Sequence, residues 1–361
     1  MESMRRIGIL TSGGDCQGLN AAIRGVAKAL YHEFPNDVTI YGIQDGYSGL
    51  IYGNYKVMHP SDFSGILTLG GTILGTSRQP FKQIRVIGEN SVDKVKNMKM
   101  HYKEMGLDCL VVLGGNGTHK TANLLAEEGL HVIGLPKTID NDIWGTEITF
   151  GFTSAMDIAT DVIDRIHTTA TSHGRIFVVE LMGHKAGWLT LYAGLAGGAD
   201  VILIPEIPYD IDRVAEEIAR REKAGKKFSI LAVAEGAVSV EEAAMKKKVF
   251  KASRAAMEYP SIAYRVAKEL EERTKHEVRV TVPGHFQRGG SPCPTDRVLS
   301  TRFGTTAARL IKKEQYGYMV ALQQEHIVPV PLGEVAGKLK LVTPDCGAVL
   351  SARELGICFG D

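Results

Sequence analysis

The sequence of 361 residues contains no long apolar segment. No run approaches the roughly 20 consecutive apolar residues that a membrane-spanning helix needs. The apolar run after the charged start is also too short for a signal peptide. Five cysteines are scattered without a Cys-x-x-Cys motif, a pattern typical of reduced thiols in the cytosol. We therefore expect a soluble, cytoplasmic protein.

The chain also lacks a charge excess. Forty-two lysines and arginines balance 41 acidic residues, and the longest basic run is Lys246-Lys247-Lys248. Nucleic acid is therefore not expected as a partner, and any anion site must be built locally. Hydrophobic content of 44% is that of a normal globular core, and the 40 glycines cluster in short loops.

Short apolar runs alternate with helical periodicity along most of the chain. Strands are predicted at residues 7–10, 38–43, 109–113, 131–135, 176–180, 201–204, 229–234, 278–282 and 319–322. Helices are predicted at residues 20–32, 92–105, 118–128, 154–171, 187–196, 211–222, 241–273 with an interruption at Pro260, and 295–312. This alternation predicts an α/β protein with two similar three-layer α/β/α lobes and mainly parallel sheets.

The two lobes are expected to pack tightly, because no linker rich in proline or serine separates them. The boundary is expected near Gly151, with a return crossing near Arg288. One lobe would then comprise residues 1–151 and about 288–337, and the other residues 152–287 and about 338–361.

Three glycine loops follow predicted strands, at Gly13-Gly14, Gly70-Gly71 and Gly114-Gly115-x-Gly117. Glycine lets the backbone approach a phosphate closely, and the third loop also opens a helix, whose N-terminus favours anions. His119 stands where a Walker A loop needs glycine, and the third loop lacks the last glycine of a dinucleotide fingerprint. The pattern thus indicates a phosphate cradle of another design, although ordinary βα turns also use glycine.

The segment Pro136-Lys137-Thr138-Ile139-Asp140-Asn141-Asp142 follows the buried run at 131–135. In open α/β sheets, ligands bind beyond the carboxyl ends of strands. If the segment is extended, Thr138, Asp140 and Asp142 can face one pocket. Two close carboxylates suit a general base beside a metal ligand or an orienting group, whereas the alternative is a solvated turn.

Several basic residues and one acid stand near later strands and loops. Arginine forms bidentate contacts with phosphate, although a single arginine is more often part of a surface ion pair. Glu235 could bind sugar hydroxyls or cap a helix. The basic residues are Arg78, Arg175, Arg279, His285 and Arg288.

Five motifs, taken together in their order along the chain, resemble those of the 6-phosphofructokinases of the phosphofructokinase A type, in the ATP-dependent or mixed-substrate group. The similarity runs nearly end to end. The motifs are Thr11-Ser12-Gly13-Gly14-Asp15, Gly114-Gly115-Asn116-Gly117-Thr118, Pro136 to Asp142, Met182-Gly183-His184, and Gly284-His285-Phe286-Gln287-Arg288-Gly289-Gly290-Ser291.

The resemblance implies a role for each matching residue. Asp140 would take the proton from the 1-hydroxyl of fructose 6-phosphate, with Thr138, Asp142 and His184 completing the catalytic set. The phosphoryl donor would be bound by Gly14, Tyr47, Arg78, Gly115, Asn116, Gly117, Thr118 and Lys137. The sugar phosphate would be bound by Thr138, Ile139, Asp140, Arg175, Met182, Gly183, His184, Glu235, Arg279, His285, Phe286, Gln287 and Arg288.

The resemblance also implies partners. Arg175 and Arg279 would reach the sugar phosphate from a neighbouring subunit, so a homotetramer is expected. Mg²⁺ would be required. Because Asn116 stands where the family usually has an acid, the metal would depend more on phosphate oxygens and on Asp140 or Asp142.

Departures from the family pattern bear on the donor. Nucleotide-using members have glycine at position 117, where pyrophosphate-using members have aspartate, whereas Lys137 is common among the latter. We give Gly117 more weight and favour ATP. The alternatives are a pyrophosphate-dependent phosphotransferase, an NAD kinase, whose family has a related glycine loop but does not explain Gln287-Arg288-Gly289-Gly290, and a non-catalytic sugar-phosphate sensor.

His184 occupies a position where many members of that family have arginine. A histidine ordinarily loses its charge near pH ~6.5, whereas arginine stays charged. We predict that His184→Arg flattens the acid side of the pH dependence of kcat, measured from pH 5.5 to 8.5. An unchanged pH profile would count against a charge-dependent role.

Overall fold

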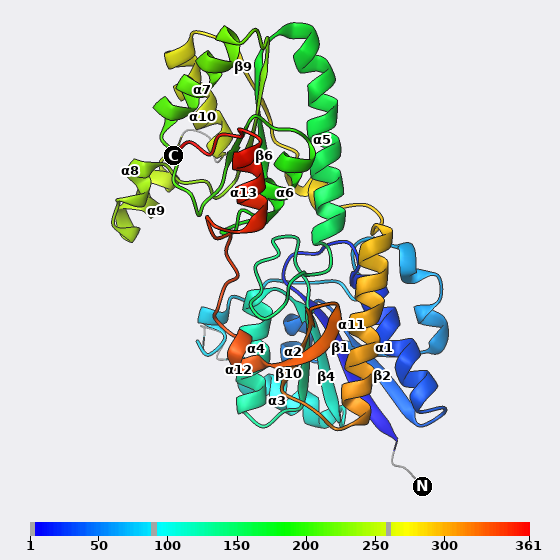
Figure 1. Cartoon of the computed structure of the whole chain (residues 1–361). Helices are drawn as coiled ribbons and strands as arrows, with labels where there is room; N and C mark the ends of the chain where they lie inside the picture. The colour runs from blue at the N-terminus through cyan, green and yellow to red at the C-terminus, as the bar shows by residue number, and fades with distance from the viewer. Residues whose placement is uncertain (1–3, 88–91, 258–260) are drawn as a thin grey trace. The chain divides into compact units, whose positions relative to one another are not determined.

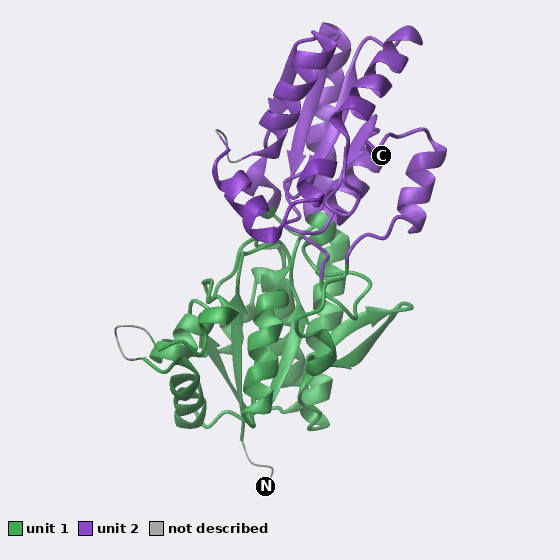
Figure 2. Cartoon of the chain, turned by 90° about the vertical axis from the view of Figure 1, so that its left-hand side faces the viewer, with its two compact units in different colours: residues 1–139, 143–154, 288–340 green, residues 140–142, 155–287, 341–361 purple. Residues whose placement is uncertain are grey.

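The computed structural model describes residues 4–87, 92–257 and 261–361, and it contains two mostly parallel sheets (Figure 1). The chain divides into two compact units, shown in different colours in Figure 2. Unit 1 comprises residues 1–139, 143–154 and 288–340, and unit 2 comprises residues 140–142, 155–287 and 341–361.

The sheet of unit 1 has seven strands in the order β11-β10-β5-β4-β1-β2-β3. Its five central strands are parallel, whereas β3 and β11 are antiparallel to their neighbours. Every residue of β4 and β5 is buried, as expected of central parallel strands. The strands are β1 (Arg5–Ser12), β2 (Val38–Ile43), β3 (Tyr55–Met58), β4 (Cys109–Gly114), β5 (Val132–Pro136), β10 (Tyr318–Gln323) and β11 (His326–Pro331).

The helices of unit 1 fall into two groups. Helices α2, α3, α4 and α12 contribute to one core cluster with Leu10, Leu110 and Val132 of the sheet. Helices α1 and α11 pack closely against each other at Gly25 and Gly304. A Cβ at Gly304 would lie only 2.6 Å from a backbone oxygen of α1, so the helices can approach this closely only because the residue is glycine. The bounds are α1 (Leu19–Glu33), α2 (Tyr47–Tyr52), α3 (Lys94–Glu104), α4 (Asn116–Glu127), α11 (Pro294–Lys312), α12 (Leu332–Val335), η1 (Pro60–Phe63), η2 (Ile66–Thr68) and η3 (Phe81–Gln83).

The sheet of unit 2 has four parallel strands in the order β7-β8-β6-β9. Leu231 and Val233 of β8 share a core cluster with residues of α7 and α10. Ala232 points the other way, toward Gly194 of α6, so the sheet has helices on both faces. The strands are β6 (Ile176–Leu181), β7 (Val201–Leu203), β8 (Ser229–Ala234) and β9 (Val278–Thr281).

The helices of unit 2 include two short ones that follow β8. The bounds are α5 (Phe152–His173), α6 (Trp188–Ala196), α7 (Ile211–Lys223), α8 (Val240–Ala243), α9 (Lys247–Ala255), α10 (Ile262–Thr274), α13 (Gly347–Glu354) and η4 (Gly284–Arg288). No helix in the described part of the chain has the length and apolar character needed to cross a bilayer.

The predicted fold class is confirmed, and each of the nine predicted strands coincides with an observed one. The two antiparallel edge strands and the short helices α2, α12 and α13 were not predicted. Strand β11 contains Pro329 and Pro331, and proline argues against a strand unless it lies at an edge. The interruption predicted at Pro260 lies outside the described residues.

Candidate active site

Three adjacent strands of unit 1 end on a common row. Ser12 of β1 is paired with Gly114 of β4, and Gly114 is paired with Pro136 of β5. The loops that carry Gly14, Gly115 and Lys137 therefore leave the sheet side by side at its carboxyl edge. This edge is where open α/β sheets bind ligands.

The first loop is held by a neighbouring segment. Gly13 has a φ of +87°, a left-handed conformation that glycine adopts without strain. Its N–H donates to the carbonyl of Ser77 over 3.0 Å, and the hydroxyl of Thr76 donates to the carbonyl of Gly13 over 2.7 Å. These bonds bring the segment that carries the exposed Arg78 to the same loop.

Two cationic side chains converge on the first loop. The ammonium of Lys137, whose side chain is buried, donates to the carbonyl of Gly14, and Nη1 of Arg288 donates to the carbonyl of Asp15 over 3.1 Å. A Cβ at Gly14 would lie 3.0 Å from that guanidinium, so a larger residue would displace it. Burial raises the pKa of the nearby Cys16 to about 12, so that thiol stays neutral.

The Gly70-Gly71 pair differs from its prediction. It follows the 3₁₀ turn η2 rather than a strand. The amide of Asn20 donates to the carbonyls of Leu69 and Gly70, both over 3.2 Å. A Cβ at Gly70 would lie 2.1 Å from the carbonyl oxygen of Gly290. This glycine is therefore required for close backbone packing.

The third loop forms the N-terminus of α4, with Gly115 as its N-cap residue. Gly117 is exposed, and a Cβ there would meet no atom within 4 Å outside its own turn of helix. Thr118 donates to the carbonyl of Ser12 over 3.4 Å and accepts, at its own carbonyl, the hydroxyl of Tyr47 at 3.0 Å. Tyr47 is only 1% exposed, so it supports the first turn of α4 from within the core.

A residue that the sequence analysis did not place in the site, His119, lies beneath this loop. The fully buried imidazole Nδ1 donates to the carbonyl of Gly115 over 2.9 Å. Its ring fits against Gly134 of β5, where a Cβ would lie 2.7 Å from Cδ2 and Nε2. Burial lowers the pKa of His119 to about 4, so the ring is neutral. Gly134, a glycine inside a buried strand, is the sequence signal that could have revealed this close contact.

The segment that follows β5 is not extended as predicted. The chain bends at Ile139 and Asp140, and Asn141 has a φ of +51°. Asparagine adopts this left-handed conformation more readily than most residues. Strict alternation of side chains therefore ends at Thr138, whose carbonyl accepts the hydroxyl of Thr149 at 2.7 Å.

A divalent cation such as Mg²⁺ needs oxygen ligands. The described residues contain no group of three or more histidine, cysteine, aspartate or glutamate side chains that could hold a metal. Asn116 directs its amide nitrogen to the carbonyl of Lys338, at 2.5 Å. The side chains present fit a magnesium ion held mainly by substrate phosphates and one or two carboxylates rather than by a protein cage.

In unit 2, the loops after β6 and β8 meet at one carboxylate. Leu181 and Ala234 are paired at the ends of these strands. Glu235 follows β8, and its Oε1 accepts the N–H groups of Gly183 at 3.2 Å and His184 at 2.7 Å. Glu235 therefore positions the loop after β6, whether or not it also contacts a ligand.

Residues of η4 join the same edge of the sheet. The side chain of Gln287 is fully buried, accepts the N–H of Met182 at 3.2 Å and donates to the carbonyl of Gly284 over 3.0 Å. His184 and His285 are exposed, and Phe286 is 70% exposed. Arg288, the last residue of η4, is assigned to unit 1.

Arg175 and Arg279 lie at the other end of this sheet, where its strands begin. Arg175 directly precedes β6, and Arg279 is paired with Phe177 at the start of that strand. Both bind Glu277, with Nε of Arg175 2.6 Å from Oε2 and Arg279 on Oε1. Because β6 has six residues, roughly 20 Å of strand separates them from Met182.

A family model described as "Phosphofructokinase" matches residues 6–311. The chain belongs to the phosphofructokinase family. An ATP-dependent 6-phosphofructokinase of Spirochaeta thermophila is 58% identical over 99% of this chain and 98% of its own length. ATP-dependent 6-phosphofructokinase 3 of Bacteroides thetaiotaomicron is 51% identical over 98% of this chain and all of its own length.

Solved phosphofructokinase structures share this fold. The enzyme of Pichia pastoris, in its T-state, has a TM-score of 0.80 and 32% identity over 93% of this chain and 36% of that chain. A pyrophosphate-dependent phosphofructokinase of Nitrosospira multiformis has a TM-score of 0.80 at 19% identity, over 99% of this chain and 93% of its own. The latter likeness concerns the fold alone.

The buried, neutral His119 predicts a pH dependence of stability for this phosphofructokinase. Its folded pKa lies below the ordinary 6.5, so the unfolded chain binds the proton first and stability falls as pH drops from about 6.5 toward 4. We expect this group to account for about 2 kcal/mol of stability lost between pH 7 and pH 5. Urea unfolding of wild type and His119→Asn, which keeps a donor for Gly115 but does not titrate, measures the difference. Equal pH dependence of the two proteins would contradict the assignment.

Proposed function

We propose that this chain is an ATP-dependent 6-phosphofructokinase. It would transfer the γ-phosphoryl group of ATP to the 1-hydroxyl of D-fructose 6-phosphate, giving fructose 1,6-bisphosphate and ADP, the committed step of glycolysis. Two relatives that carry this name are 58% and 51% identical over nearly the whole chain. The structural observation that carries the proposal is the common row on which β1, β4 and β5 end.

The donor lobe, residues 1–151 and about 288–337, would hold the phosphates by backbone N–H groups. The N-terminus of α4 and the turn after β1 follow adjacent paired strands, so their N–H groups would face the donor phosphates. A helix N-terminus favours anions, and Lys137 and Arg288 add positive charge at the first turn. Arg78 would contact the donor from the adjoining segment, with Tyr47 supporting α4 from below.

The sugar lobe, residues 152–287 and about 338–361, would bind fructose 6-phosphate at the loops joined by Glu235. Met182, Gly183, His184 and Glu235 lie together at the carboxyl edge of β6 and β8. The residues of η4, from His285 to Arg288, would complete the pocket. Arg175 and Arg279 lie at the far edge, so they would serve a neighbouring subunit, as a homotetramer allows.

The proposed chemistry is in-line phosphoryl transfer with little covalent participation by the protein. Asp140 would accept the proton of the 1-hydroxyl, while Thr138, Ile139 and Asp142 fix its surroundings. His184 would lie beside the transferred phosphoryl group. Mg²⁺ would neutralise charge on the donor phosphates when bound, with Asp140 or Asp142 as its protein ligand. We place the enzyme in the cytoplasm.

The donor preference follows from the open space at Gly117. Outside its own turn of helix, no atom lies within 4 Å of a Cβ built there, so the bare backbone would leave room for a nucleotide's phosphates. The second candidate donor is pyrophosphate, which Lys137 favours.

Initial rates with fructose 6-phosphate and either MgATP or magnesium pyrophosphate test the proposal directly. Turnover with pyrophosphate alone would reverse the donor assignment, and turnover with neither donor would favour a sugar-phosphate sensor.

We predict that Gly117→Asp lowers kcat/KM for ATP by about tenfold or more, because the carboxylate would repel the donor phosphates. The fold should persist, since the Cβ has open space and an acid is favourable in the first turn of a helix. Gly117→Asn is the matched control of similar size without charge. A loss of similar size in both variants would point to crowding instead of charge.

We predict that Asp140→Ser reduces kcat by about 10²–10⁴-fold, the range typical of a lost general base. Binding of fructose 6-phosphate, measured by calorimetry in the absence of donor, should change by less than about threefold. If turnover survives at near wild-type rates, Asp140 is not the base. If sugar binding is lost as well, its role is not confined to proton transfer.

A further inference from the structure

The segment after β8 contains two short helices that lie at the surface of unit 2. Helix α9 has no buried residue, and Val249 on its surface is 54% exposed. In Figure 1, α8 and α9 are the outermost helices on the left side of unit 2. We call residues 240–255 the arm. Because apolar burial does not hold α9, other contacts must fix the arm to the rest of the unit.

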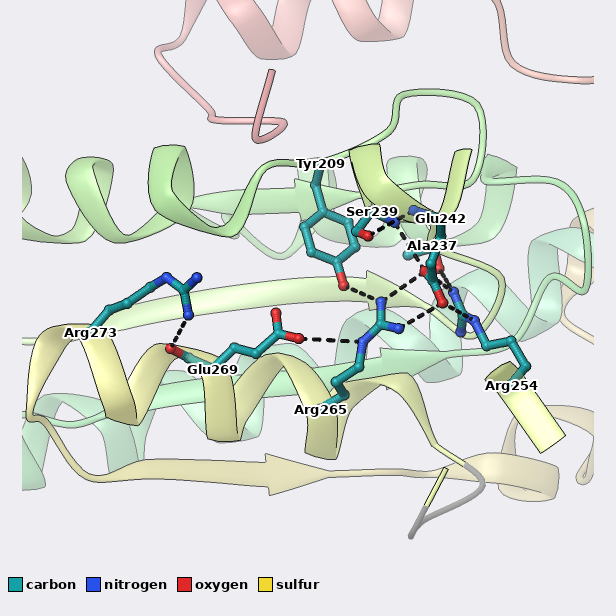
Figure 3. Close-up of polar contacts among 8 residues, drawn as sticks. All are labelled: Tyr209, Ala237, Ser239, Glu242, Arg254, Arg265, Glu269 and Arg273. Carbon is teal, nitrogen blue, oxygen red and sulfur yellow. Dashed lines mark hydrogen bonds and ion pairs between the residues drawn. The ribbon is translucent and has the colours of Figure 1, made fainter. Parts of the chain in front are cut away.

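One buried carboxylate, Glu242 of α8, provides those contacts (Figure 3). Arg254 of α9 places Nε 2.7 Å from Oε1 and Nη2 2.8 Å from Oε2. Arg265 of α10 donates to the same two oxygens over 2.6 and 2.8 Å, and also to the hydroxyl of Tyr209 over 2.8 Å. The N–H of Ser239 adds a further bond of 3.1 Å. Two guanidinium groups therefore share one carboxylate that is only 4% exposed.

The charge state of this cluster is fixed by its partners. Burial opposes ionisation of Glu242, but hydrogen bonds from Arg265, the N–H of Ser239 and Arg254 outweigh it and lower its pKa. The carboxylate thus stays charged over the working pH range. Removing one guanidinium would leave a buried charge only partly compensated, which is costly.

Arg254 has a second contact that leads toward the sugar-binding loops. Its Nη2 also donates to the carbonyl of Ala237, a buried residue two positions after Glu235. Between them, Gly236 lies so close to the loop after β6 that a Cβ would be 2.1 Å from the carbonyl oxygen of His184. The chain from Glu235 to Ala237 is therefore fixed at one end by His184 and at the other by Arg254.

We propose that Arg254 is a positioning residue for fructose 6-phosphate. By holding Ala237 and Glu242 together, it fixes Glu235 in the place where its carboxylate accepts the N–H groups of Gly183 and His184. The arm thus holds the loops after β6 and β8 in place. This inference rests on the proposed function, because that function identifies the substrate whose binding would depend on the arm. A shift of the order of 1 Å in a positioned group is enough to weaken binding and catalysis.

The test is a steady-state comparison of Arg254→Ala with Lys251→Ala, an exposed basic residue of the same helix. We expect Arg254→Ala to raise KM for fructose 6-phosphate by about tenfold, with KM for ATP changed by less than about twofold. Lys251→Ala should leave both constants unchanged. A selective effect on one substrate is a result that general loss of stability does not produce.

Arg254→Lys covers the case in which the alanine variant fails to fold. Lysine keeps the charge beside Glu242 but lacks the planar fork that serves Glu242 and Ala237 together. We expect the KM for fructose 6-phosphate to rise by about threefold to fivefold. The melting temperature of this variant should equal that of the wild type. An unchanged KM in folded variants overturns the inference, as does an equal rise in both KM values. If the wild-type enzyme does not phosphorylate fructose 6-phosphate, the proposed function itself fails.

Discussion

The candidate site depends on the hydrogen-bond register of three parallel strands. Because β1, β4 and β5 are paired so that Ser12, Gly114 and Pro136 form one row, their following loops must begin at the same level. Side by side, the three loops combine a left-handed glycine turn, a helix N-terminus and a buried lysine, which together suit an anion.

Specific side-chain contacts support the backbone around this row. His119 fills the space left by Gly134 and donates to the loop carbonyl, so α4 and β5 fit together at one point. The hydroxyl of Tyr47 donates to the carbonyl of Thr118, the residue of α4 that precedes His119. In unit 2, Glu235 joins two loops in the same manner through backbone N–H groups. Both units thus use a buried or half-buried polar side chain to hold the backbone that would contact the ligand.

Strand direction separates the predicted sugar-phosphate residues into two sets. Met182 and Glu235 follow strands of unit 2, whereas Arg175 and Arg279 stand where strands begin. In a parallel sheet, residues at the amino ends of the strands and residues at their carboxyl ends cannot line the same pocket, because the full strand length lies between them. The ion pairs with Glu277 keep both arginines together in this chain. Their distance from the carboxyl ends of the strands is the observation that supports the proposed sharing of a site between subunits.

The sequence by itself determined the fold class, the central strands and the phosphofructokinase motifs. Buried parallel strands are continuous apolar runs, and glycines at strand ends carry a recognisable pattern. It did not reveal the edge strand β11, whose prolines argue against pairing, or the bend at Ile139 and Asp140.

Only the tertiary structure decided which distant residues support the site. His119 meets Gly134, and Arg254 meets Ala237, through contacts between elements that no local pattern encodes. Local sequence fixes backbone preference and periodicity, because these depend on neighbouring residues. The position of one side chain against another element depends on how whole strands and helices pack, and that is settled only when the chain is folded.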